Sequence, residues 1–219
     1  MLERIINEIN KMSGCYSGYE IFSDWVKAAA ISISNSADQV RGDVWKKRKA
    51  LYMEIAKRHG AEHMKIFSDM LGMLTLALED NMEDVLGKIY MKAGFGSRQT
   101  GQFFTPFHLS YLMAQTTIPE EFGEEKPFTI NEPSSGGGGA VIAAAKVLKD
   151  RGINFQKCMD VVAQDLDWKG VYMTYTQLSL LGIKAVVVQG DTLKEPYIPG
   201  CTPEERIMYT PAKIFGTWG

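Results

Sequence analysis

Three segments rich in glycine and acidic residues follow short apolar runs in the second half of the chain. They are Asn131 to Gly139, Gln164 to Asp167 and Gln189 to Leu193. Glycine lets a backbone approach a ligand closely, and the N–H groups at the start of a following helix attract a carboxylate or phosphate. A carboxylate such as Asp165 can accept hydrogen bonds from ribose hydroxyls, and Asp191 can accept one from an adenine amine. These residue types therefore predict a site for a ligand that contains a nucleoside.

Four short apolar runs predict strands, and two helical patterns separate the first three of them. The strands are expected at 128–130, 160–163, 185–188 and 206–209, and the helices at 138–149 and 168–181. This alternation indicates an α/β fold with right-handed β-α-β units and a parallel sheet. Ligands bind beyond the carboxyl ends of such strands, so the three segments are expected to meet at one edge of the sheet. Each segment alone could be only a turn, or a helix cap at Asp165 or Asp167, but the three together favour a site.

The first part of the chain has a different pattern. Apolar residues recur at helical spacing from Met1 to about Phe95. No proline occurs before Pro106, which suits helices because proline breaks a helix interior. We therefore expect an N-terminal helical domain over residues 1–95 and an α/β domain over residues 96–219.

The composition is that of a soluble globular protein rather than a disordered chain, with 45% hydrophobic and 23% charged residues. The formal net charge of -2 gives no global basic field for non-specific nucleic-acid binding. Three cysteines without pairing or metal-ligand spacing indicate a reducing compartment. No apolar stretch approaches the roughly 18 to 20 residues that span a membrane. We expect a cytoplasmic protein without membrane contact.

Histidine and basic residues give weaker signals. His59 and His63 are four residues apart, a spacing that could place two metal ligands on one helix face, but no third ligand is evident. We predict no metal site and an exposed helix end at these histidines. His108 could approach the predicted ligand site, but it is expected to pack near a helix start. The basic segment 41–58 could contact DNA phosphates, although its pattern also suits a solvated surface.

Five motifs in order resemble the modification subunits of type I restriction systems and related phage or plasmid methylases. They are Asp84-Val85-Leu86-Gly87-Lys88-Ile89-Tyr90, Gly101-Gln102-Phe103-Phe104-Thr105-Pro106, the glycine loop with its Glu-Pro start, Gln164-Asp165, and Gly190-Asp191-Thr192-Leu193. Those proteins are S-adenosylmethionine-dependent adenine-N6 DNA methyltransferases. The resemblance therefore implies a Rossmann-like methyltransferase sheet, shortened here, with S-adenosyl-L-methionine as the cofactor.

The same resemblance implies a role for individual residues. The implied cofactor-binding residues are Phe104, Thr105, Pro106, Glu132, Pro133, Ser134, Gly136, Asp165, Leu166 and Asp191. The first three would border the methionine part of the cofactor, and the segment 132–136 would cradle its amino and carboxylate groups. Asp165 would hold the ribose with Leu166 against the adenine ring, and Asp191 would read the adenine amine.

The family's catalytic motif departs from its usual form in this chain. It reads Asn or Asp, Pro, Pro, then an aromatic residue after the fourth strand, and the aromatic ring stacks on the flipped base. No Pro-Pro occurs here, and the best placed candidate is Tyr209-Thr210-Pro211-Ala212-Lys213. Thr210 then replaces the acceptor side chain, and Lys213 stands where the ring should be. We assign Thr210 and Pro211 to a degenerate catalytic position and expect cofactor binding with little or no methyl transfer by this chain alone.

Two other functions remain open at this point. One is a non-catalytic protein that senses S-adenosylmethionine or binds a partner in a restriction-modification or phage system, which the segment from Thr210 to Lys213 favours. The other is a nucleotide-binding dehydrogenase, which the glycine pattern and the Phe-Phe-Thr-Pro motif disfavour.

The usual methyltransferase strand order, 3-2-1-4, leads to an expectation about assembly. It would place the fourth strand, Arg206 to Tyr209, beside the first strand with its outer edge unpaired. An open edge invites association. We therefore expect this edge to be buried in a homodimer, covered by the N-terminal helices, or docked on a partner subunit.

Overall fold

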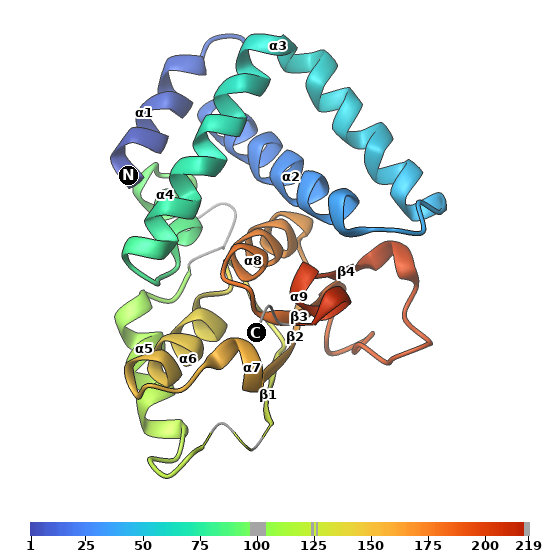
Figure 1. The fold of residues 1–219 in the computed structure, drawn as a ribbon. Coiled ribbons are helices and arrows are strands. Elements are labelled where there is room, and N and C mark those ends of the chain that lie inside the picture. Colours follow the sequence, from blue (N-terminus) through green and yellow to red (C-terminus); the bar gives the residue numbers. More distant parts are fainter. Residues whose placement is uncertain (97–103, 124, 126, 217–219) are drawn as a thin grey trace.

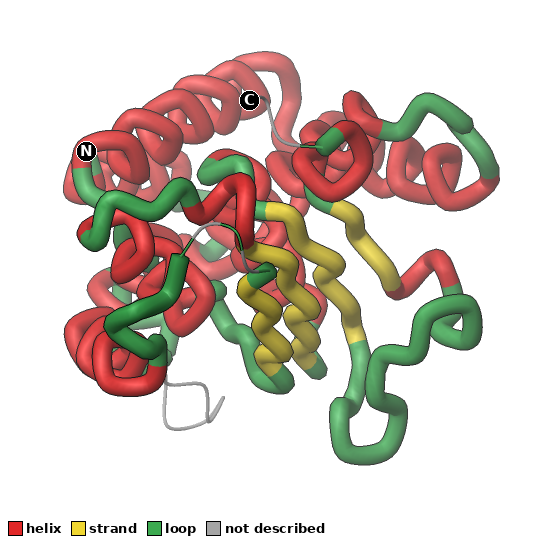
Figure 2. The backbone as a smooth tube through the Cα atoms, turned by 60° about the horizontal axis from the view of Figure 1, so that its bottom comes forward, coloured by secondary structure: helices red, strands yellow, loops and turns green. Residues whose placement is uncertain are grey.

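The computed structural model describes residues 1–96, 104–123, 125 and 127–216 (Figure 1). Gly101, Gln102 and Phe103 of the predicted Gly-Gln-Phe-Phe-Thr-Pro motif lie outside the described residues. Within the described part, the chain forms a mixed α/β structure in which helices surround a four-stranded sheet (Figure 2).

The first four helices form the N-terminal part, as the spacing of apolar residues predicts. They are α1 (Leu2–Met12), α2 (Gly18–Ala37), α3 (Asp43–Asp80) and α4 (Val85–Lys92). Ser17 and Glu20 form a capping box that starts α2. The α3 helix bends at Gly60, where φ is 73°, a left-handed conformation that favours glycine. Trp25 Nε1 donates a 3.1 Å hydrogen bond to the carbonyl oxygen of Phe67, which joins α2 to α3 inside the apolar core.

The second part of the chain alternates helices and strands. In order these are α5 (Phe107–Thr117), β1 (Phe128–Glu132), α6 (Gly139–Asp150), α7 (Phe155–Cys158), β2 (Met159–Asp165), α8 (Trp168–Leu180), β3 (Lys184–Gln189), the 3-10 helix η1 (Glu204–Arg206), β4 (Ile207–Tyr209) and α9 (Pro211–Phe215). All four predicted strands and both predicted helices are present.

The sheet has the order β1-β2-β3-β4, with β1, β2 and β3 parallel and β4 antiparallel to β3. The expectation that the fourth strand lies beside the first is therefore wrong. A parallel neighbour requires a long crossover connection, usually a helix. The connection between β3 and β4 contains Pro196, Pro199 and Pro203 and forms only turns and η1, so the chain returns antiparallel beside β3.

The α8 helix joins the helical part to the sheet (Figure 1). Its Val171, Tyr175 and Leu178 pack in the apolar core around the sheet, and Met173 packs in the core of the N-terminal helices. Arg48 of α3 also donates a hydrogen bond to the carbonyl oxygen of Ile207 in β4. The N-terminal helices thus contact the fourth strand directly. No helix among the described residues is long and apolar enough to cross a membrane.

Candidate functional site

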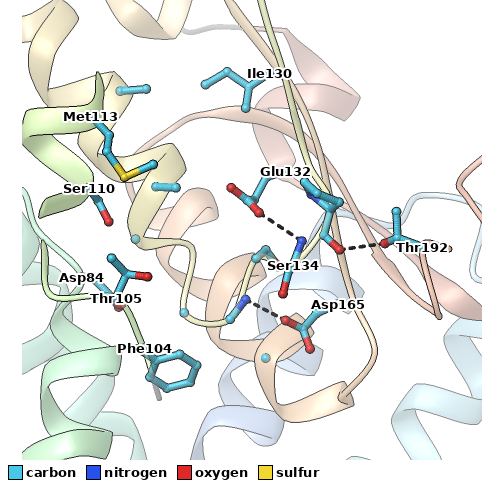
Figure 3. Close-up of a pocket in the computed structure, with 18 of the residues that line it drawn as sticks. Asp84, Phe104, Thr105, Ser110, Met113, Ile130, Glu132, Ser134, Asp165 and Thr192 are labelled. Carbon is cyan, nitrogen blue, oxygen red and sulfur yellow. Dashed lines mark hydrogen bonds between the residues drawn. The ribbon is translucent and has the colours of Figure 1, made fainter. Parts of the chain in front are cut away.

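A cavity of about 940 Å³ lies at the carboxyl ends of β1, β2 and β3 (Figure 3). Its walls come from α5, the glycine loop that precedes α6, and the segments that follow β2 and β3. Nine predicted cofactor-binding residues line it, namely Phe104, Thr105, Glu132, Pro133, Ser134, Gly136, Asp165, Leu166 and Asp191. Pro106 is not in the lining, and its carbonyl oxygen accepts the first backbone hydrogen bonds of α5.

The Asp165 carboxylate ties the glycine loop to the end of β2. Its Oδ2 accepts a 2.7 Å hydrogen bond from the Gly136 N–H, and its Oδ1 accepts a 2.9 Å bond from the Asp167 N–H (Figure 3). Burial raises the pKa of the Asp165 carboxyl, and these two N–H donors lower it in part. A carboxylate offers about four acceptor positions, so Asp165 keeps capacity for hydroxyl groups of a ligand.

Backbone and side-chain hydrogen bonds join the three strand-end segments. Glu132 Oε1 accepts from the Ser134 N–H at 3.0 Å, which closes the turn after β1. Thr192 Oγ1 donates to the Pro133 carbonyl oxygen at 2.7 Å, and the Gly190 N–H donates to the Asp165 carbonyl oxygen at 2.9 Å. The prediction that these segments meet at one edge of the sheet is confirmed.

Two predicted adenosine contacts lie at the open side of the cavity. The Leu166 side chain lines it while remaining 67% exposed, so an apolar surface is available to a ring. Asp191 Oδ1 accepts from the Leu193 N–H at 3.0 Å, and its Oδ2 lies 3.4 Å from Lys194 Nζ. The Asp191 carboxylate therefore caps its own turn at the cavity wall.

Phe104 connects the glycine loop to the helical part. A Cβ atom on Gly136 would lie 2.8 Å from ring carbons of Phe104, and Gly136 has a φ of 53°. Only glycine fits this position without displacing the ring. The Phe104 ring also packs against Tyr90 of α4, with ring centroids 5.1 Å apart.

Asp84, at the start of α4, places a buried carboxylate in the cavity wall. Its Oδ1 accepts hydrogen bonds from the Gly87 N–H and from Gln177 Nε2, both at 2.8 Å. The same Gln177 amide donates to the Gly137 carbonyl oxygen at 2.7 Å and accepts from the Leu86 N–H at 3.1 Å. Burial raises the pKa of the Asp84 carboxyl. The pair thus holds α4, α8 and the glycine loop together.

The family model for N-6 DNA methylases matches residues 81–212, which is more than half of the chain. The chain belongs to the N-6 DNA methylase family. This confirms the family predicted from the ordered motifs. No curated protein matches the chain.

The match to this methylase family begins just before Asp84 and so includes the Asp84–Gln177 pair. Sequence reasoning noticed the segment from Asp84 to Tyr90 only as part of the resemblance and assigned it no role at the site. Asp84 looks in sequence like an ordinary helix cap, which it also is. Gln177 sits inside an amphipathic helix, and a fully buried glutamine is visible only once α8 is packed.

The structure does not bring Thr210 and Pro211 to this cavity. Because β4 is antiparallel, its end lies beside the start of β3, at the opposite end of the strand from Gln189. Thr210 is buried, and its hydroxyl donates to the Ile183 carbonyl oxygen at 2.7 Å and accepts from the Ala185 N–H at 2.9 Å. Pro211 opens α9. The catalytic assignment rested on the position of this segment after the fourth strand in the sequence, but the Thr210 hydroxyl joins β4 to β3 and does not line the cavity.

Two of the three histidines pack inside the helical part of the chain. The expectation of an exposed helix end at His59 is wrong, because His59 is buried and its Nε2 lies 2.8 Å from Asp24 Oδ2. His63 packs beside it, with ring centroids 5.8 Å apart. His108 is exposed in the first turn of α5 and does not line the cavity. The described residues hold no group of three side chains that could bind a metal ion.

Proposed function

We propose that the cavity at the strand ends binds S-adenosyl-L-methionine and that the chain supplies the methyl-donor site of an adenine-N6 DNA methylase. The observation that carries this proposal is the hydrogen bond between Asp165 and Gly136, which places a half-buried carboxylate and a close-approach glycine loop in one large cavity. The parallel arrangement of β1, β2 and β3 supports a Rossmann-like sheet, in which nucleosides bind at the carboxyl ends of the strands.

The residues in the cavity fit the parts of this cofactor. Asp165 would accept hydrogen bonds from the ribose hydroxyls, and Leu166 offers an exposed apolar side chain to the adenine ring. Glu132 and the N–H groups around Ser134 would hold the amino and carboxylate groups of the methionine moiety. The bound cofactor supplies an electrophilic methyl group on a sulfonium. The chain's own contribution is to bind the cofactor, orient it and shield it on the side of Phe104.

Binding of the target adenine needs groups that the described cavity does not hold. No Pro-Pro of the family's acceptor motif occurs in the sequence, and Thr210 does not line the cavity. In the described sheet, β1 pairs with β2 alone. The cavity extends beside β1 to an apolar end formed in part by Met113 and Ile130 (Figure 3). A further segment or a partner subunit along this edge would complete the site. The chain alone is therefore proposed to bind the cofactor without efficient methyl transfer.

This geometry also favours a second candidate function, a non-catalytic S-adenosylmethionine sensor or partner-binding protein, because the donor site is built while the acceptor site is not. DNA and a partner subunit are proposed as macromolecular partners in either case. Three exposed lysines of the segment 41–58, Lys46, Lys49 and Lys57, support phosphate contact on the outer side of α3.

Calorimetry with S-adenosylmethionine and its demethylated product, S-adenosylhomocysteine, tests the donor site. Both should bind the parent chain at one site. The Asp165→Ala variant should bind about 30-fold to 1,000-fold more weakly, because two hydrogen bonds to a charged group are lost, worth about 2 to 4 kcal/mol together. Asp167→Asn is the matched control, since Asp167 is two residues away and does not line the cavity. Equal affinity of Asp165→Ala and parent would refute the proposal.

A methyl-transfer assay on mixed-sequence DNA separates the two candidate functions. Labelled methyl groups should enter DNA only when a further subunit or segment that carries the acceptor motif is added. Efficient incorporation by the purified chain alone would show that an acceptor site exists within it and would exclude the non-catalytic candidate.

A further inference from the structure

A second cavity, of about 510 Å³, lies between α2, the first part of α3 and the start of α8. Each helix contributes one face: Tyr19, Ser23 and Lys27 follow one another at four-residue intervals on α2, and Lys47 and Leu51 do so on α3. The two cavities share no lining residue. The junction of β2 and α8 contributes to both, because Leu166 before α8 lines the first cavity and Trp168, the first residue of α8, lines the second.

Basic side chains dominate the lining of this second cavity. They are Lys27, Lys47, Arg48 and Lys169, against the carboxylates of Asp24 and Glu205. Asp24 is already engaged, because Arg58 and His59 each lie 2.8 Å from its Oδ2. Lys27, Lys47 and Arg48 form no ion pair with any carboxylate of the described residues. The cavity therefore carries positive charge that the described chain does not neutralise.

Arg48 is a half-buried cation in this cavity. Its guanidinium donates to Ser34 Oγ at 2.8 Å and to the Ile207 carbonyl oxygen, both uncharged acceptors. Burial lowers the pKa of Arg48. A guanidinium has five N–H donors, so Nη1 and Nη2 of Arg48 each keep a donor for a further acceptor. An anion in the cavity would give this partly buried cation the direct ion pair that it does not form within the described residues.

Aromatic side chains form another part of the wall. Trp168 and Tyr172 stack on each other along α8, with ring centroids 5.2 Å apart and an interplanar angle of 27°. Both are half-buried and line the cavity, as does the partly exposed Tyr19. Tryptophan and tyrosine surfaces accept planar rings by stacking, as in proteins that bind single-stranded nucleic acid. A ligand that carries both a negative charge and a planar ring matches this combination.

We propose that this second cavity is a nucleotide-binding site. The phosphate is held by Lys47 and Arg48 from α3 and by Lys27 from α2, and the base lies against Trp168. The ligand chemistry is a nucleoside phosphate, either free or as one unit of a DNA strand. The site is independent of the proposed cofactor site and does not require methyl transfer.

Binding of thymidine 5′-monophosphate, followed by quenching of tryptophan fluorescence and by calorimetry, tests the proposal. Excess S-adenosylhomocysteine fills the first cavity, and a pyrimidine probe avoids competition for an adenosine site. The monophosphate should bind at least about tenfold more tightly than thymidine or inorganic phosphate alone. The Lys47→Ala variant should weaken it about tenfold or more, as loss of a charge-assisted hydrogen bond predicts.

Matched variants keep the result interpretable. Lys46→Ala is the control for Lys47→Ala, because Lys46 is the adjacent exposed lysine, pairs with Asp43 and lies outside the cavity lining. Trp168→Phe should retain most of the affinity and Trp168→Ala should lose it, with melting temperature confirming that each variant folds. Equal weakening by Lys46→Ala and Lys47→Ala would indicate general surface attraction and overturn the proposal, as would equal binding of the monophosphate and inorganic phosphate.

Two further arms identify the source of the nucleotide. A thymidine oligonucleotide of about twelve residues should bind much more tightly than the monophosphate if the site holds one unit of a strand. Equal affinity per site would assign it to a free nucleotide. The Asp165→Ala variant should bind the monophosphate and the oligonucleotide as tightly as the parent protein does. A wrong assignment of the cofactor site can therefore be told apart from a wrong assignment of the second cavity. No binding of either probe by the parent protein would refute the site.

Discussion

Asp84 and Gln177 lie 93 residues apart in the sequence and meet behind the glycine loop, where Gln177 Nε2 donates a 2.8 Å hydrogen bond to Asp84 Oδ1. Gln177 also bonds the backbone of Leu86 and Gly137. The buried amide of Gln177 therefore connects α4 to the glycine loop, which lines the proposed cofactor site. The stability of the loop and that of the helical part are coupled through this side chain.

The Gln177→Ala variant should be destabilised by about 3 kcal/mol or more, because it removes one of the two hydrogen bonds that Asp84 Oδ1 accepts and takes this partner from the backbone groups of Leu86 and Gly137 in the interior. Urea unfolding measures the change. Gln115→Ala is the matched control, since Gln115 is an exposed glutamine in the last turn of α5 and should change stability by less than about 0.5 kcal/mol. Equal stability of the two variants would show that the buried network contributes nothing.

The raised pKa of Asp84 predicts a dependence of stability on pH. A buried acid with a raised pKa binds its proton more tightly in the folded than in the unfolded state. Stability therefore falls as the pH rises from the ordinary value of 3.8 toward the folded-state pKa. In Asp84→Asn the amide oxygen can still accept both bonds that Oδ1 accepts. The variant should thus gain stability relative to the parent at neutral pH and lose that advantage near pH 3.8. A difference independent of pH would contradict this.

Gly136→Ala tests the close contact in the glycine loop. The new methyl group would lie 2.8 Å from the Phe104 ring, on a residue with a φ of 53°. We expect a loss of about 1 to 3 kcal/mol in stability and at least a tenfold loss in cofactor affinity, because the N–H that faces Asp165 moves with the loop. Gly123→Ala is the control, since nothing lies within 4 Å of its added Cβ and its φ is not positive. If the Gly136→Ala variant bound the cofactor as tightly as the parent protein, the glycine loop would not be part of the cofactor site.

Features that depend on residues close together in the sequence could be predicted, and features that depend on tertiary packing could not. The strands and the helices α6 and α8 follow from apolar runs and glycine breaks, so their limits were predicted to within a few residues. The meeting of Asp165 with Gly136 follows from the rule that parallel strands present their carboxyl ends together. The position of β4 was predicted from the usual strand order of methyltransferases, which places it beside β1. The proline-containing connection after β3 instead leads to an antiparallel strand beside β3. The burial of His59 depends on tertiary packing against α2, which periodicity does not report.

The position of Thr210 leads to a prediction that separates a structural from a catalytic role. Thr210→Val removes the hydroxyl that bonds Ile183 and Ala185 and should destabilise the protein by about 1 to 3 kcal/mol. Thr210→Ser keeps that hydroxyl and should lose less. Affinity for S-adenosylmethionine should be the same in both variants, since Thr210 does not line the cavity. A large change in cofactor affinity without a change in stability would restore the catalytic assignment.

The last prediction concerns assembly through the C-terminal edge of the sheet. In the described sheet β4 pairs with β3 alone, and Arg48 contacts it only at the Ile207 carbonyl oxygen. Exposed apolar side chains gather in this part of the sequence, namely Ile198, Tyr209, Ile214 and Phe215. An unpaired strand with exposed apolar neighbours favours association, and a two-fold homodimer is the commonest symmetric form.

We therefore expect sedimentation of the parent protein to give a dimer at micromolar concentration. Tyr209→Lys should shift it to a monomer, because a charged side chain would be buried at the contact, whereas Tyr209→Phe should leave the dimer intact. The side chain is 40% exposed in the chain alone, so neither substitution should disturb the fold. A parent protein that is monomeric at micromolar concentration would exclude the homodimer. A heterologous subunit on β4 would then be the remaining partner, and Tyr209→Lys should weaken its binding in the same assay.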